Sequence, residues 1–130
     1  NFRDAIKVDS RHIGSYVNLG VAFYNNGKGD LKRALDPLKK AVGYEPNNIL
    51  ALYNLGLVLL QDGNAKEAVN HLRKAAGIAA DDPDVLYLYG LSLMETNRSR
   101  EALINFEKVL TIDPGNVNAQ KAVALVQNKK

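Results

Sequence analysis

Cysteine and tryptophan are absent from this sequence of 130 residues, and methionine occurs once. Without cysteine the chain has no disulfide, no thiolate ligand for a metal and no cysteine nucleophile. This absence fits a reducing cytoplasm and a cysteine-free periplasmic protein equally well. We expect the cytoplasm, with the periplasm or a membrane association through missing segments as alternatives.

Long apolar runs are also missing. No stretch approaches the roughly eighteen uninterrupted apolar residues of a membrane-spanning helix, so direct insertion into a membrane is not expected. The first residue is Asn rather than Met, and we therefore expect the chain to be a fragment of a longer protein.

Charge of one sign is scarce too. The net charge is +3, and the stretch from Lys28 to Lys40 supplies it, with five basic residues against two acidic ones. A nucleic-acid-binding surface usually spreads basic residues more widely and places aromatic residues among them, so nucleic acid is not an expected partner. With 46% hydrophobic and 24% charged residues, the composition is typical of a globular domain.

Small residues recur at a fixed spacing. Ala34, Ala68 and Ala102 are 34 residues apart, and four residues after each comes a large apolar one: Leu38, Leu72 and Phe106. The pairs Leu19-Gly20, Leu55-Gly56 and Tyr89-Gly90 precede them at spacings of 36 and 34, because the turn NNGKGD gives the first unit two extra residues. Self-similarity at such a period is the signature of a repeat array.

Each unit is predicted to be two amphipathic helices joined by a short turn. In the second unit apolar residues recur at helical spacing from Leu52 to Leu59, the turn QDGN interrupts them, and the spacing resumes at Ala68. Asn64 and Glu67 resemble a capping box at the start of that second helix. We expect helices over 13–26, 31–44, 49–62, 65–79, 83–96, 99–111 and 117–128, after a helical stub over 1–8.

The combination of these landmarks resembles the tetratricopeptide repeat. In the three units they are Tyr16, Leu19, Gly20, Phe23, Ala34, Leu38 and Pro46; Leu52, Leu55, Gly56, Leu59, Ala68 and Leu72; and Leu86, Tyr89, Gly90, Leu93, Ala102, Phe106 and Pro114. The resemblance implies an all-α, right-handed superhelical solenoid of antiparallel helix pairs, with three units and partial units at both ends. Ala80 stands where the family has proline, with Pro83 three residues later, which should shift that junction slightly.

We expect one solenoid domain over 1–130. Its parts are the tail of a preceding repeat over 1–10, repeats over 11–48, 49–82 and 83–116, and a C-terminal capping helix over 117–130. The tail is expected because Phe2, Ala5 and Ile6 match Leu38, Ala41 and Val42, and the cap because Gln120 and Gln127 replace bulky core residues. Glycine paired with alanine should let the two helices of a unit approach closely, with the large residues beside them.

No arrangement of residues predicts catalysis. His12 and His71 are isolated, and both are expected to be structural or solvated. The GKGD stretch follows no predicted strand and lacks a third glycine, so it is not a dinucleotide-binding loop. Asp81, Asp82 and Asp84 lie at a repeat junction, where helix N-termini favour acidic residues. We predict a protein without enzymatic activity, cofactor or metal.

A second apolar stripe runs along each first helix, on a face about 100° from the core stripe. It consists of Val17, Val21 and Tyr24, then Tyr53, Leu57 and Leu60, then Tyr87, Leu91 and Met94. The resemblance implies that these residues line a concave groove, and exposed apolar patches commonly mark binding sites. The alternative is that they only pack successive first helices together. Three tyrosines favour the groove, because their hydroxyls prefer a wet or hydrogen-bonding surrounding.

Polar residues beside this stripe complete the candidate site: Asn18, Asn25, Asn54 and Gln61. Asn18 and Asn54 resemble the asparagine ladder of the repeat domain in O-linked N-acetylglucosamine transferases, although Leu88 breaks the series; alternatively, asparagine simply suits an exposed helix position. A carboxylate clamp of the chaperone-tail type is not expected, because the matching positions hold Val17, Val21, Asp84 and Leu88, with only Asn54 retained.

The leading hypothesis is a scaffold that binds an apolar peptide or partner helix of another protein in the groove. One alternative is a self-assembly module that stacks through its open N-terminal end, with Phe2 and Ile6 at the contact. Another is the targeting domain of a larger enzyme. The basic stripe Lys32, Arg33, Lys39 and Lys40 is expected on the convex surface as a solvated face.

Overall fold

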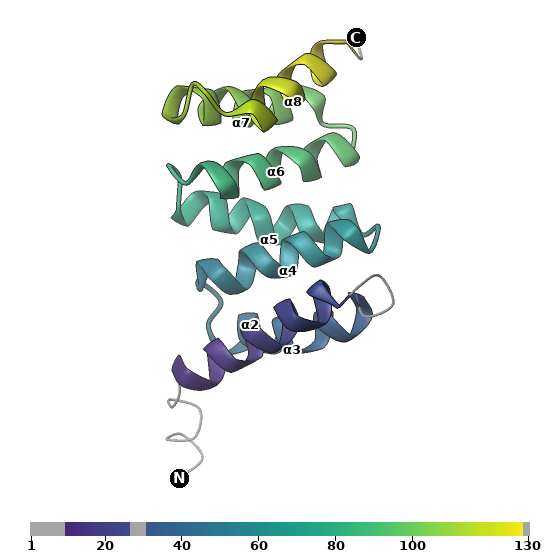
Figure 1. Ribbon diagram of the computed structural model, residues 1–130, viewed down its shortest axis with the longest axis vertical. Coiled ribbons are helices and arrows are strands. Elements are labelled where there is room, and N and C mark those ends of the chain that lie inside the picture. Colours follow the sequence, from purple (N-terminus) through teal and green to yellow (C-terminus); the bar gives the residue numbers. More distant parts are fainter. Residues whose placement is uncertain (1–9, 27–30, 129–130) are drawn as a thin grey trace.

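A computed structural model of the chain describes residues 10–26 and 31–128 (Figure 1). The described part contains helices and no strand, which confirms the all-α prediction. The helices are α2 (Ser10–Asn25), α3 (Leu31–Tyr44), α4 (Ile49–Gln61), α5 (Ala65–Ile78), α6 (Pro83–Glu95), α7 (Ser99–Ile112) and α8 (Val117–Asn128). Each lies within three residues of its predicted range, and the predicted stub over 1–8 lies outside the described residues.

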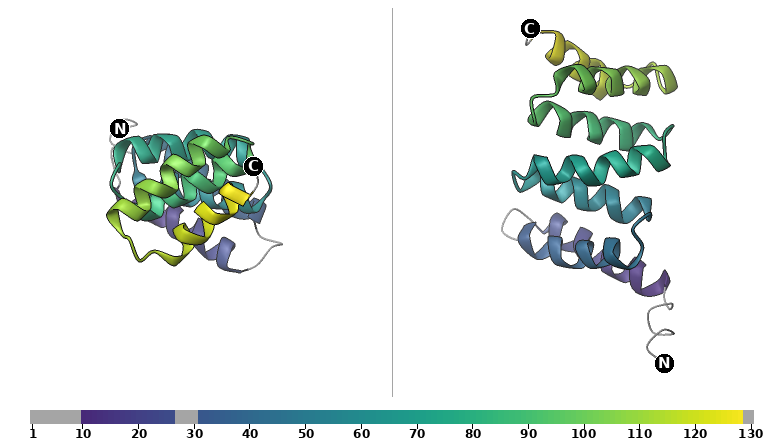
Figure 2. Two further views of the ribbon diagram at one scale, coloured as in Figure 1. Left: turned by 90° about the horizontal axis from the view of Figure 1, so that it is seen from above. Right: turned by 180° about the vertical axis from the view of Figure 1, so that it is seen from behind.

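The helices follow one another in chain order along the long axis, with α2 at one end and α8 at the other (Figures 1 and 2). Each helix packs against the next one in the chain. The first helices of successive units also touch directly, α2 against α4 and α4 against α6, whereas contacts between second helices are sparser. The first helices therefore form the more tightly packed side of the stack. None of the described helices is both long and apolar enough to cross a bilayer.

The junctions between units share a side-chain cap that the sequence analysis missed. Asn48, Asp82 and Asn116, spaced 34 residues apart, each stand immediately before a first helix. Their side-chain oxygens accept bonds from the backbone N–H groups of Ala51 at 3.0 Å, Asp84 at 3.0 Å and Ala119 at 2.9 Å. Such caps stabilise a helix by about 1 kcal/mol each. Pro83 follows Asp82 as the first residue of α6, a position that tolerates proline because its N–H group would have no partner within the helix. Ala80, where the family has proline, lies in the turn between α5 and α6.

The turns within units use a different device. Gly63 and Asn97, again 34 residues apart, have positive φ angles of 84° and 63°. The N–H groups of the next residues, Asn64 and Arg98, donate to carbonyls five residues back at 2.8 Å, which is a Schellman ending for α4 and α6. The capping box predicted at Asn64 is wrong. Its amide donates to Glu67 Oε1 at 3.2 Å, and its side chain accepts no bond from the helix backbone.

In the core of each unit, a glycine of the first helix packs against a large side chain of the second helix. A Cβ atom added to Gly20, Gly56 or Gly90 would lie 2.5 Å from a carbon of Leu38, Leu72 or Phe106, respectively. The alanines at 34, 68 and 102 are fully buried in the same cores. The close approach of the two helices is confirmed, with one correction: the large residue lies directly against the glycine rather than beside it.

The last helix buries one face only. Ala119, Ala122 and Val126 are buried in the contact between α8 and the rest of the stack, while Gln120 and Gln127 are exposed. Gln120 Nε2 also donates to the carbonyl of Pro114 at 2.9 Å. The exposed face also carries Val117 and Leu125, which are 57% and 56% exposed, so it is only partly polar. The capping role stays a prediction.

Candidate interaction groove

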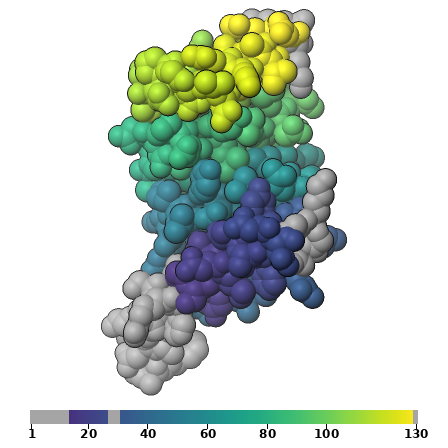
Figure 3. All heavy atoms as spheres, viewed as in Figure 1, coloured from purple at the N-terminus to yellow at the C-terminus, as the bar shows by residue number. Residues whose placement is uncertain are grey.

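Most of the predicted stripe lies on the surface side of the first helices. The described side chains of α4 and α6 that belong to it, Tyr53, Leu57, Leu60, Tyr87, Leu91 and Met94, are all partly buried and pack against the core from one side. Val21 and Tyr24 of α2 lie in the same way. Figure 3 shows all atoms in the view of Figure 1, with α2 at the lower end, α8 at the upper end and the intervening units between them. These eight residues thus contribute to packing and keep part of their surface exposed.

Val17 is the exception. It is only 2% exposed and belongs to the main core cluster, so a partner cannot contact it. The residues at the same offset on α4 and α6, Tyr53 and Tyr87, are larger and remain partly exposed. The assignment of Val17 to the groove was wrong.

The polar candidates are less uniform than the sequence suggests. Asn18, Asn25 and Gln61 are exposed, but the Asn54 amide donates to the carbonyl of Leu50 in its own helix at 2.8 Å. Leu88, where the asparagine series breaks, is buried in the core. Asn18 and Asn54 therefore do not form an equivalent pair, because Asn54 already uses one of its donor hydrogens within α4.

Leu50, which was not among the predicted site residues, extends the α4 stripe by one turn. Leu50 precedes Tyr53 by three residues and is 58% exposed. Together with Ile49, Tyr53 and Val85 it lines a pocket of about 320 Å³ whose remaining residues are Asp82 and Asp84. Burial raises the pKa of Tyr53, and the negative charges of Asp84 and then Asp82 raise it further. Following the helical period backwards from Tyr53 would have found Leu50.

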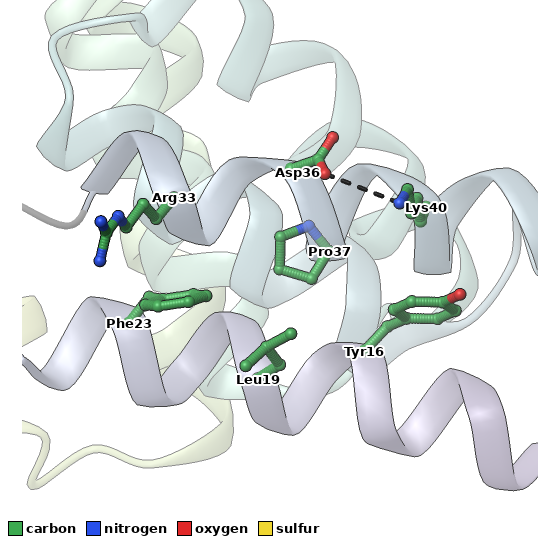
Figure 4. A pocket seen from close by; sticks show the side chains of 7 residues that line it. All are labelled: Tyr16, Leu19, Phe23, Arg33, Asp36, Pro37 and Lys40. Atoms are coloured by element: carbon green, nitrogen blue, oxygen red, sulfur yellow. Dashed lines mark ion pairs between the residues drawn. The ribbon is translucent and has the colours of Figure 1, made fainter.

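A second concavity lies between α2 and α3, with a volume of about 330 Å³. Figure 4 shows Tyr16, Leu19 and Phe23 projecting from α2 towards α3. The Arg33 guanidinium lies 5.9 Å from the centre of the Phe23 ring, and Lys40 Nζ lies 6.0 Å from that of Tyr16. Lys40 also pairs with Asp36 at 3.7 Å, the dashed contact in Figure 4. These cations cover aromatic rings while keeping their charged ends at the surface.

Leu19 in this concavity is 47% exposed, whereas its counterparts Leu55 and Tyr89 are 1% and 9% exposed. The helices that carry Leu55 and Tyr89 each pack against the second helix of the preceding unit. Tyr89 additionally accepts a hydrogen bond at 3.3 Å from Arg73 Nε of that preceding helix. The face around Leu19 is therefore the repeat interface at the N-terminal end of the described stack.

The remaining polar candidates have structural partners. His71 is partly buried, with Nε2 3.8 Å from the Glu67 carboxylate. Burial lowers the His71 pKa, and the Glu67 carboxylate partly opposes this shift. Lys39 of the basic stripe pairs with Glu67 at 3.6 Å. The side chain of His12 lies outside the described part of the chain, and within that part no group of His, Asp and Glu is placed to hold a metal ion.

Comparison with known families agrees with the repeat. The model of the family described as "Anaphase-promoting complex, cyclosome, subunit 3", which is of the tetratricopeptide type, matches residues 28–109. The chain belongs to this tetratricopeptide-repeat family. Proteins built from this repeat are generally interaction modules without enzymatic activity. A comparison with curated proteins gave no match.

Solved structures show the same fold. The second tetratricopeptide domain of human RPAP3, in complex with the HSP70 peptide SGPTIEEVD, has a TM-score of 0.82 at 21% identity over 89% of this chain and 95% of that one. The first such domain of Spaghetti (RPAP3), bound to the HSP90 peptide SRMEEVD, has a TM-score of 0.87 at 18% identity over 94% and 95%. MamA from Desulfovibrio magneticus RS-1 has a TM-score of 0.83 at 24% identity over 90% and 65%.

Proposed function

We propose that this tetratricopeptide protein is a non-enzymatic scaffold whose first helices bind an apolar peptide or partner helix. The observation that carries the proposal is the row of partly buried apolar and tyrosine side chains on α2, α4 and α6, to which the exposed Leu50 on α4 is added. Such a row offers apolar area that is already held in place by packing, so binding loses little side-chain entropy. Tyr24, Tyr53 and Tyr87 add hydroxyls for hydrogen bonds at a wet interface.

The row is also long enough for an extended partner. It crosses three successive first helices, and α4 touches both α2 and α6 directly, so the open faces of neighbouring first helices adjoin. An amphipathic helix or an apolar strand laid across them would meet an anchor from each unit. Solved relatives in complex with chaperone peptides support the general mode, a peptide bound to a tetratricopeptide domain.

The test is to capture proteins from a cell lysate on the immobilised chain and on two matched variants of it. Leu57→Glu places a charge in the middle of the groove, and Ile104→Glu places one on α7, at an exposed position on a second helix. Circular dichroism establishes that both variants remain folded. Proteins captured by the parent chain should be retained by Ile104→Glu and lost by Leu57→Glu. Equal capture by both variants would move recognition away from the first helices and contradict the proposal.

A second candidate function is self-assembly through the N-terminal end of the stack. The observation that favours it is the exposed Leu19, whose counterparts in the next two units are buried by a preceding helix. A second copy that packs on this face would bury the same side chains. Phe2 and Ile6, expected at such a contact, lie outside the described residues. Sedimentation analysis tests the idea: Leu19→Asp should abolish an oligomer formed by the parent chain, and a parent that remains monomeric at high concentration would exclude self-assembly.

A further inference from the structure

The two central first helices, α4 and α6, differ in charge from the second helices. Helix α4 contains no ionisable group except Tyr53, and α6 contains Asp84 and Glu95 but no lysine or arginine. Most lysines and arginines of the described helices are on the second helices: Lys32, Arg33, Lys39 and Lys40 on α3, Lys66, Arg73 and Lys74 on α5, and Arg100 and Lys108 on α7. The others are Arg11 on α2 and Lys121 on α8. The middle of the groove is therefore acidic and apolar, although the whole chain has a net charge of +3.

The acidic groups lie at one apolar pocket. Asp82 and Asp84 line it together with Ile49, Leu50 and Val85. Asp82 Oδ1 accepts from the N–H groups of Asp84 at 3.0 Å and Val85 at 3.4 Å, so its carboxylate is fixed at the start of α6. The Asp84 side chain is exposed and makes no ion pair within the part of the chain that the structure describes. Capping explains Asp82, and the helix N-terminus favours an acidic residue such as Asp84 in the first turn of α6. Neither effect accounts for Leu50, which is 58% exposed beside the two carboxylates.

The field of these carboxylates reaches the apolar stripe. Burial is the first cause of the raised Tyr53 pKa, and Asp84 and Asp82 are the next two. A group that feels both carboxylates lies where a partner's side chain would enter the groove. In this position a cation is attracted and an anion is repelled, and the low polarity of the pocket walls strengthens both effects.

We propose that the groove selects a segment in which an aliphatic side chain is flanked by lysine or arginine, with the aliphatic group in the pocket at Leu50 and a cation beside Asp84. This inference rests on the proposed function and specifies the partner's chemistry. It gives the groove the opposite charge preference to the peptides in the two RPAP3 complexes, whose sequences SGPTIEEVD and SRMEEVD end in two glutamates, valine and aspartate. An acidic segment of that kind would bring its carboxylates towards Asp82 and Asp84.

The experiment compares three synthetic peptides by fluorescence anisotropy with the full chain. Their sequences, KALLKALK, QALLQALQ and EALLEALE, share one aliphatic pattern and differ only in charge. The basic peptide should bind about tenfold more tightly than the acidic one in low salt, since attraction of lysine to Asp82 and Asp84 replaces repulsion of glutamate by the same carboxylates. The difference should shrink between about 0.05 M and 0.5 M NaCl, because salt screens exposed charges.

Variants locate the effect. Asp84→Asn should weaken the basic peptide about two- to fivefold and leave the neutral peptide unchanged. The matched control, Glu107→Gln, removes one exposed carboxylate from α7 and should change neither. Leu57→Glu should abolish binding of the neutral peptide, which depends on the apolar groove alone.

The outcomes separate this inference from the proposed function. If all three peptides bind equally and Leu57→Glu abolishes binding, the charge preference is wrong and the apolar groove stands. A preference for the acidic peptide would likewise overturn the charge preference alone. If no peptide binds, or if the basic peptide binds without any effect of Leu57→Glu and Asp84→Asn, both proposals fail.

Discussion

The contact between Gly56 and Leu72 allows a sharp test of how each unit is held together. Replacing Gly56 by alanine adds a Cβ atom that would lie 2.5 Å from Cγ, 2.6 Å from Cδ2 and 2.9 Å from Cδ1 of Leu72. Leu72 is fully buried, so its side chain cannot move aside without displacing other core groups. We expect overpacking to cost about 1 to 3 kcal/mol in the free energy of unfolding. The higher helix propensity of alanine offsets about 1 kcal/mol of this cost. The net loss in the free energy of unfolding is therefore up to about 2 kcal/mol.

A control glycine isolates the packing contribution. Gly77 lies in α5, is exposed and has open space where a Cβ atom would be. Gly77→Ala should therefore stabilise the protein by about 0.5 to 1 kcal/mol through propensity alone. The free energies of unfolding of both variants are measured by urea denaturation followed by circular dichroism. The difference between the two substitutions, about 1 to 3 kcal/mol, is then the cost of the contact with Leu72.

A double-mutant cycle identifies the residue responsible. Leu72→Ala alone should cost about 2 to 5 kcal/mol because it leaves a cavity in the core. In that background Gly56→Ala has room, and its cost should disappear, which gives a coupling energy of about 1 to 3 kcal/mol. If Gly56→Ala stabilises the chain as much as Gly77→Ala does, the close approach of α4 and α5 does not hold these units together and the reasoning is refuted.

Three further predictions follow from the repeated landmarks. Ala68→Leu should overpack the second unit by about 1 to 3 kcal/mol, and an unchanged melting temperature would contradict the alignment of the repeats. Asn97→Val should lose about 1 to 2 kcal/mol by urea denaturation, because a β-branched residue is strained at a φ of 63°, whereas Asn97→Gly should be neutral or stabilising. Burial lowers the folded-state pKa of His71 below 6.5, so the unfolded chain binds its proton first. The contribution of neutral His71 to stability should thus be present above about pH 6.5 and decline as the pH falls towards the folded-state pKa, a slope that His71→Gln should reduce in urea titrations.

The fold was predictable because the same pattern of small and large core residues occurs three times. A small residue at 34, 68 and 102 fixes the period, and each predicted helix could be checked against its counterparts. The caps Asn48, Asp82 and Asn116 share the same period, but they were missed because the residue type changes between amide and carboxylate. The function of such a cap depends on an oxygen at the right position rather than on one residue type.

The groove was harder to predict because periodicity on one helix does not show what covers that helix. Val17 has the same offset as Tyr53 and Tyr87, yet it is buried in the core, whereas both tyrosines keep part of their surface exposed. Asn54 has the right position for a ligand contact, but its amide is bonded to Leu50 of its own helix. The exposure of a side chain and its hydrogen-bond partners depend on tertiary structure. They could not be predicted from the periodicity of a single sequence.

The glycine contacts also indicate where this chain tolerates a change of length. The first unit has two more residues between its landmarks than the others, but its Gly20 lies as close to Leu38 as Gly56 lies to Leu72, with the same 2.5 Å for an added Cβ atom. The additional residues are thus absorbed between α2 and α3 without loss of register in the unit. Closing a longer loop costs only about 0.6 kcal/mol for each doubling of its length. An insertion between α2 and α3 should therefore leave the contact between Gly20 and Leu38 in place.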